Sequence, residues 1–119
     1  MNRLVIKVTA GVEAPERLSQ AFTVAATAVS SGVPVSLWLT GEASWLALPG
    51  RAEEFHLEHA APLADLLGSV LAGGSITLCT QCAQRRGIEP SDVISGIQIA
   101  GAASFVGEVT TEGVQALIY

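Results

Sequence analysis

The sequence predicts a three-layer α/β domain in which a mainly parallel five-stranded sheet carries helices on both faces. Short runs rich in valine, isoleucine and leucine alternate with helix-like segments along the whole chain, a pattern typical of parallel strands joined by helical crossovers. The first run is almost continuously apolar, as expected of a strand buried on both faces. Because 119 residues suffice for one hydrophobic core, we expect a single domain over residues 1–119.

The first third of the chain predicts a strand, a helix and a second strand. Residues 4–8 (LVIKV) form the first β-branched run. Pro15 suits the first position of a helix over residues 15–30. The apolar face of this helix repeats at helical spacing in Leu18, Ala21, Phe22, Ala25, Ala26 and Val29. A Ser-Gly pair then ends the helix, and residues 33–39 are strand-like again.

The rest of the chain continues this alternation after a long irregular segment. Residues 40–61 are expected to be mostly loop, with a short helix at 43–48, and a long loop in a small domain is often functional. The later elements are expected, in order, as a helix from 62 to 73, a strand at 75–78, a helix at 80–86, a helical turn at 90–92, a strand at 97–99, a helix at 102–109 and a strand at 114–118. In the helix at 102–109, Phe105, Val106 and Val109 are expected to point inward.

The composition of the chain limits the kinds of molecule that it is expected to bind. Apolar residues make up 50% of the chain and charged residues only 14%, where about 25% charged is typical of a soluble domain. A surface so poor in charge predicts a homo-oligomer. The net charge of −5 leaves no basic stripe for a phosphate backbone, so we expect no nucleic-acid partner. Neither glycine-rich nucleotide-binding pattern follows a strand, and no nucleotide or other cofactor is expected.

We expect no membrane segment and a cytoplasmic location. The long uncharged stretches at 18–41 and 66–84 are interrupted by serine, threonine, glycine and glutamine, so each is interpreted as a buried helix followed by a buried strand. The first eight residues offer no long apolar core and no cleavage site of a secretory signal. Two cysteines in a small cytoplasmic chain favour reactive or metal-binding roles over a structural disulfide.

The candidate reactive residues are Cys79 and Cys82. Cys79 directly follows the third predicted strand and precedes a predicted helix, where free backbone N–H groups favour an anion such as a thiolate. In parallel sheets, ligand sites lie beyond the carboxyl ends of the strands. Cys82 would lie one helical turn further on, within reach of a disulfide or a shared metal ion. Arg85 and Arg86 could add positive potential to this site.

These residues carry a resemblance to the DsrE/DsrF-like family, which includes YchN-like proteins and sulfur-relay subunits of the TusBCD type. The resemblance extends over nearly the whole chain through Thr9-Ala10-Gly11, residues 15–18, Gly32-Val33-Pro34-Val35, Leu39-Thr40-Gly41-Glu42 and Cys79 with Arg85-Arg86-Gly87. It implies a flavodoxin-like α/β protomer that assembles as a homotrimer, a hexamer or a mixed ring. It also implies that Cys79 accepts sulfane sulfur as a persulfide from a donor protein and passes it to an acceptor protein. Cys82 would then resolve the persulfide or be inert.

Other functions remain open at this point. A Cys-x-x-Cys pair after a strand also occurs in thioredoxin-like thiol–disulfide exchangers. His56 and His59 together with the two cysteines would make a His2Cys2 set suited to zinc. The chain could also be a non-catalytic, partner-binding subunit of a sulfur-metabolism complex, in which the cysteines do not react. Trp38 and Trp45 are expected to serve packing, and nothing in the sequence places Glu42 or Glu58 near sulfur.

Overall fold

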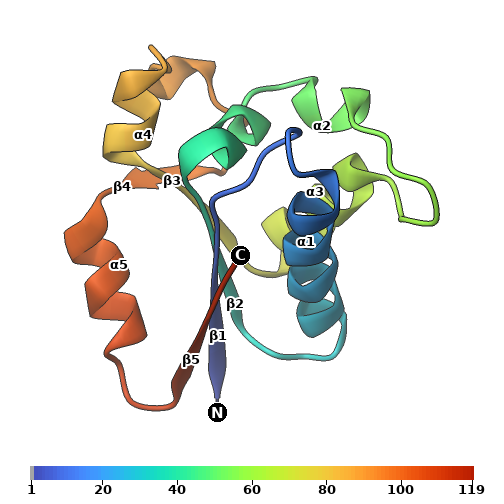
Figure 1. The fold of residues 1–119 in the computed structure, drawn as a ribbon. Helices are drawn as coiled ribbons and strands as arrows, with labels where there is room; N and C mark the ends of the chain where they lie inside the picture. Colours follow the sequence, from blue (N-terminus) through green and yellow to red (C-terminus); the bar gives the residue numbers. More distant parts are fainter. Residues whose placement is uncertain (1) are drawn as a thin grey trace.

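The computed structural model describes residues 2–119 and has one five-stranded sheet in which every pairing is parallel (Figure 1). Its strands are β1 (Arg3–Val8), β2 (Val35–Leu39), β3 (Ser75–Cys79), β4 (Gln98–Ala100) and β5 (Val114–Ile118). The spatial order is β4-β3-β2-β1-β5. The α/β class with helices on both faces is therefore confirmed. The protein resembles flavodoxin in its three-layer architecture but not in its strand order. The strand order of flavodoxin is 2-1-3-4-5.

Two helices cover one face of the sheet and one covers the other. Figure 1 shows α1 (Pro15–Ser30) and α3 (Leu63–Gly73) together on one side, with α5 (Ala102–Val109) on the opposite side. The short helices α2 (Arg51–Glu54) and α4 (Thr80–Arg85) and the 3-10 helices η1 (Gly41–Ala47) and η2 (Pro90–Asp92) complete the fold. The loop expected at residues 40–61 thus holds two helical segments. Among residues 2–119, no helix combines the length and hydrophobicity needed to cross a membrane.

The main core lies between the sheet and the pair α1 and α3. The expected apolar face of α1 is buried from Leu18 to Ala26, and Val29 packs at its margin. Alanines on this face bring the helices close together. A Cβ atom added at Gly73 would collide with Cγ1 of Val29. The small residues in the sequence therefore set the distance between the two helices.

The opposite face of the sheet is only partly covered, and the expectation that Val106 points inward is wrong. Val106 is 54% exposed, and no residue of α5 is fully buried. Phe105 does point inward and meets the buried ring of Trp38 edge to face, with 5.4 Å between ring centroids. The indole nitrogen of Trp38 donates to Glu108 at 3.2 Å. A single eight-residue helix over a five-stranded sheet can bury only one narrow stripe, which explains why Val106 faces outward.

Register places the ends of β2 and β3 side by side. Leu39 pairs with Leu78 and Cys79 pairs with Ala100 of β4. Because the strands are parallel, the segments that follow them leave the sheet at the same edge. The start of η1 at Gly41 is thereby brought next to the start of α4.

Candidate functional site

Cys79 is the last residue of β3 and the residue immediately before α4. Its backbone is extended, with φ −65° and ψ 129°, so it ends the strand and turns the chain into the helix without strain. The thiol is half-buried, and its Sγ lies 3.7 Å from Oε1 of Gln81, as a weak S–H donor would. This is the position that the sequence predicts for the reactive cysteine.

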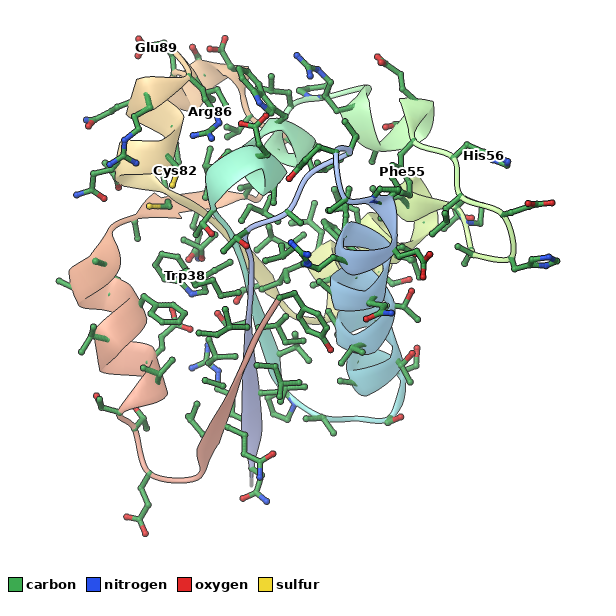
Figure 2. All side chains as sticks on the ribbon, viewed as in Figure 1. Trp38, Phe55, His56, Cys82, Arg86 and Glu89 are labelled. Atoms are coloured by element: carbon green, nitrogen blue, oxygen red, sulfur yellow. The ribbon has the colours of Figure 1, made fainter. Side chains whose placement is uncertain are left out.

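Cys82 lies in the first turn of α4 and is buried, with 8% of its surface exposed. Its Sγ accepts a hydrogen bond from the backbone N–H of Gly41 at 3.3 Å. Figure 2 shows Cys82 on α4 and Arg86 directly after this short helix, at the carboxyl end of the sheet. A sulfur that accepts a backbone hydrogen bond is better suited to the anionic form than to the neutral thiol.

Glycine is required at the position that donates this bond. Gly41 has φ +52°, and a Cβ atom there would lie 2.7 Å from the carbonyl oxygen of Thr9. The neighbouring contact is equally tight, since a Cβ at Gly11 would lie 2.6 Å from the carbonyl oxygen of Glu42. The loop after β1 and the start of η1 therefore pack backbone against backbone. This packing holds the Gly41 amide against Cys82.

Arg86 ties the helix to η1. Its Nε and Nη2 donate to Oε2 of Glu42 at 3.2 and 2.8 Å, and its Nη1 donates to the carbonyl oxygen of Cys82 at 3.1 Å. The guanidinium carbon also lies 6.0 Å from the ring centroid of Trp45. The side chain of Arg86 is only 17% exposed. The arginine is therefore anchored beside Cys82.

These contacts change the acidity of the buried cysteine. Burial by itself raises the pKa of the Cys82 thiol, because it disfavours the charged form. Hydrogen bonds from Gly41 and Cys79, and the positive charges of Arg86 and Arg85, act in the other direction and outweigh burial. The pKa of Cys82 is consequently below that of an ordinary cysteine. The geometry thus pairs a partly exposed thiol at Cys79 with a buried thiol at Cys82 whose pKa is lower than that of an ordinary cysteine.

The structure brings the two predicted cysteines together but not the predicted histidines. His56 lies beside Phe55 on the far side of the molecule from Cys82 (Figure 2). His59 lies in a separate cleft against α1. Over the described range, no group of three or more His, Cys, Asp or Glu side chains is placed to hold a metal ion. The four-residue zinc set is therefore not assembled in this structure.

Sequence reasoning missed Gly41 as a hydrogen-bond donor and Glu42 as the partner of Arg86. The available signal was topological, because Glu42 follows β2 just as Cys79 ends β3, and adjacent parallel strands end at one edge. Trp45 is a packing residue, as expected, and stacks with Arg51 at 5.1 Å as well as with Arg86.

The chain matches one protein-family model and a group of solved structures that includes the following three. The model of the DsrE/DsrF-like family matches residues 2–113. The YchN protein of E. coli superposes with a TM-score of 0.82 at 20% identity over 100% of both chains. MTH1491 of Methanobacterium thermoautotrophicum, a protein of unknown function, gives 0.74 at 10% identity over 100% of both chains. BT1422 of Bacteroides thetaiotaomicron gives 0.63 at 16% identity over 99% of this chain and 95% of that one.

One curated relative also matches. The uncharacterized protein MJ0760 of Methanocaldococcus jannaschii is 27% identical over 116 residues, which are 97% of this chain. The match spans 42% of the length of that relative. The structural similarities, all at low identity, establish the fold.

Proposed function

This chain belongs to the DsrE/DsrF-like family, which is generally related to sulfur relay, and from that premise we propose that Cys79 carries sulfane sulfur as a persulfide. The observation that carries the proposal is the pairing at the end of β3. Cys79 is accessible enough to meet another molecule, and the neighbouring Cys82 is held in surroundings that favour its thiolate. The expected partners are a sulfur donor protein and a sulfur acceptor protein.

The loading step uses both cysteines. The thiolate of Cys82, held by the Gly41 N–H, accepts the proton of the Cys79 thiol. The Cys79 thiolate then attacks the outer sulfur of a donor persulfide, R–S–SH. A bond forms between Cys79 Sγ and that sulfur while the donor S–S bond breaks. The products are Cys79–S–SH and the donor thiolate R–S⁻, so no external oxidant is needed.

Discharge reverses the exchange with a different thiol. A thiolate of the acceptor attacks the outer sulfur of Cys79–S–SH, takes that sulfur as its own persulfide, and leaves the Cys79 thiolate. Attack by Cys82 on the inner sulfur would instead form a Cys79–Cys82 disulfide and expel sulfide. The first outcome is a relay, whereas the second is a resolving step that returns sulfur to solution.

Intact-protein mass spectrometry tests this proposal. The wild type, Cys79→Ser and Cys82→Ser proteins are each incubated with glutathione persulfide, with and without a reductant. We expect a reductant-labile gain of one sulfur atom in the wild type, the same gain at a slower rate in Cys82→Ser because the proton acceptor is missing, and none in Cys79→Ser. A loss of two hydrogen atoms in the wild type, together with no gain of sulfur in Cys82→Ser, would favour a thiol–disulfide exchanger. No adduct in any form would favour a non-catalytic subunit.

The exposed surface of α5 and β5 supports a homotrimer or hexamer as part of the same proposal. Val106 is 54% and Ile118 is 65% exposed, and the one charged residue of α5, Glu108, is engaged with Arg3 and Trp38. Light scattering would test it. We expect a multiple of the 12.2 kDa chain mass for the wild type and a smaller particle for Val106→Glu. A wild-type particle with the mass of one chain would contradict the oligomer.

A further inference from the structure

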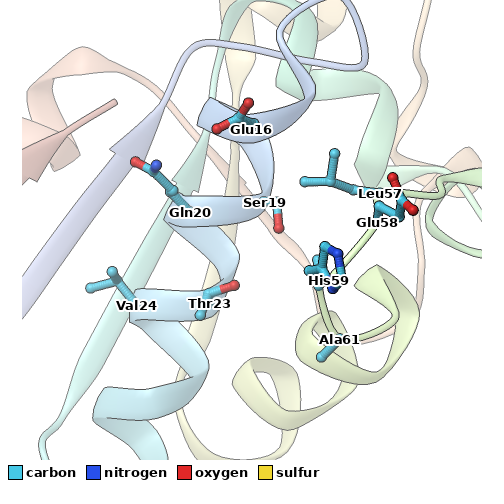
Figure 3. Close-up of a pocket in the computed structure, with 10 residues that line it drawn as sticks. Glu16, Ser19, Gln20, Thr23, Val24, Leu57, Glu58, His59 and Ala61 are labelled. Carbon is cyan, nitrogen blue, oxygen red and sulfur yellow. The ribbon is translucent and has the colours of Figure 1, made fainter.

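A second site lies away from the cysteines, in a cleft between α1 and the loop at residues 57–61. The cleft has a volume of 640 Å³, within the range of about 300–1,000 Å³ found for small-molecule sites. None of its lining residues takes part in the cysteine site or its arginine network. Figure 3 shows α1 on one side of the cleft and the loop that carries Leu57, Glu58 and His59 on the other.

Ser19 marks the floor of this cleft. The residue is 95% buried, being only 5% exposed, and it lines the cleft. Its side chain points from α1 toward the loop (Figure 3). Within residues 2–119 its hydroxyl forms no hydrogen bond with another protein group. The hydroxyl opens onto the cleft, so a polar group bound there can form a hydrogen bond with it.

The charged side chains that line the cleft favour a cationic ligand. Glu16 and Glu58 contribute carboxylates to its lining, and no lysine or arginine does so. The hydroxyl-bearing Thr23 lies one helical turn from Ser19 on the same wall (Figure 3). Carboxylate and hydroxyl oxygens are the acceptors that an ammonium group, with its three donors, requires. Anionic ligands would be repelled by the same carboxylates.

The apolar residues of the lining indicate what the ligand carries besides its charged group. Val24 on α1 and Leu57 on the loop both line the cleft, and a short hydrocarbon chain can cover their apolar surfaces. We propose that this cleft binds a primary ammonium group carried on a short alkyl chain, with Ser19 as a hydrogen-bond acceptor and Glu58 as a counter-ion. A free diamine and a lysine side chain of another protein present the same chemistry. This inference does not depend on the sulfur chemistry of Cys79.

Titrations followed by two-dimensional amide NMR test the proposal with three probes. Cadaverine represents a free diamine, Nα-acetyl-lysine amide represents a lysine side chain, and pentanol is the uncharged control. We expect the two amines to shift resonances of α1 and of residues 57–61, and pentanol to leave them unchanged. Binding of the lysine probe alone would support the site and assign its ligand to a partner protein.

Matched variants separate this site from diffuse charge attraction. Ser19→Ala and Glu58→Gln are each expected to weaken amine binding about ten- to hundredfold, as the loss of a hydrogen bond to a charged group does. Glu112→Gln removes the same charge from an exposed position outside the cleft and is expected to leave the affinity unchanged. Should Ser19→Ala fail to fold, Thr23→Val at an exposed helix position replaces it. Equal affinity for pentanol, or equal weakening by Glu58→Gln and Glu112→Gln, would overturn the proposal.

Discussion

Replacing Gly41 by alanine tests the central contact of the cysteine site. The substitution places a side chain in the left-handed region, which costs about 1–2 kcal/mol. The new Cβ would also lie 2.7 Å from the carbonyl oxygen of Thr9, a backbone atom that cannot rotate away. Such crowding adds about 1–3 kcal/mol. We therefore expect Gly41→Ala to lose about 3 kcal/mol of unfolding free energy.

Gly50 provides the matched control. It also has a positive φ, +87°, but a Cβ there meets no atom within 4 Å. Gly50→Ala should therefore lose only the conformational part, about 1–2 kcal/mol. Urea unfolding of both variants, followed by circular dichroism, measures the difference. Equal losses of unfolding free energy in the two variants would show that a Cβ atom at position 41 does not crowd Thr9, and would refute the reasoning.

The same variant has a chemical consequence. Relief of the crowding moves the Gly41 amide away from Sγ of Cys82, now 3.3 Å distant, and removes one of the interactions that lower the pKa of this thiol. Ultraviolet absorbance of the thiolate in a Cys79→Ser background follows Cys82 alone. We expect its pKa to rise in Gly41→Ala and to stay unchanged in Gly50→Ala. An unchanged value in both would remove Gly41 from the site.

Two further predictions concern the surroundings of the cysteines, and a third concerns the packing of α5. Arg86→Gln removes a positive charge near Cys82 and should raise the pKa of that thiol, measured by the same titration. Because the pKa of Cys82 is lowered in the folded protein, its stabilising contribution is fully present above the unfolded pKa of about 8.5 and is lost as the pH falls through the folded pKa. Unfolding free energies of the wild type should therefore rise with pH in that window, and Cys82→Ser should flatten the rise. Phe105→Ala removes the ring that meets Trp38 edge to face. It should lower the unfolding free energy by about 2 kcal/mol, which is less than the roughly 3–5 kcal/mol lost with a fully buried ring. If urea unfolding showed no loss, the packing of α5 would be contradicted.

Local sequence patterns accounted for most of the elements. The helix at 15–30 and the strand at 114–118 are observed with the expected bounds, and the strand expected at 75–78 extends by one residue to Cys79. Short-range signals suffice there, because apolar spacing, Pro15 and the turn at Gly32 each act within a few residues. The strand expected at 33–39 begins instead at Val35, after Pro34, which has no N–H to donate to a ladder.

The outward position of Val106 shows where such signals end. Helical spacing predicts an apolar stripe, but which of its members are buried depends on how much sheet the helix covers. Phe105 lies against Trp38 and, like Val109, is partly buried, whereas Val106 is exposed. The exposure of Val106 was decided by the position of α5 over the opposite face of the sheet.

The sequence by itself determined that a cysteine would stand between the third strand and the next helix, because an apolar run followed by a helix-forming segment places Cys79 at that junction. Only the tertiary structure decided which groups surround the cysteines. Gly41 is 41 residues from Cys82 and Glu42 is 44 residues from Arg86. These contacts arise from the parallel pairing of β2 and β3, which brings two strand ends together. Local patterns carry no information about that register, and the lowered pKa of Cys82 depends on it.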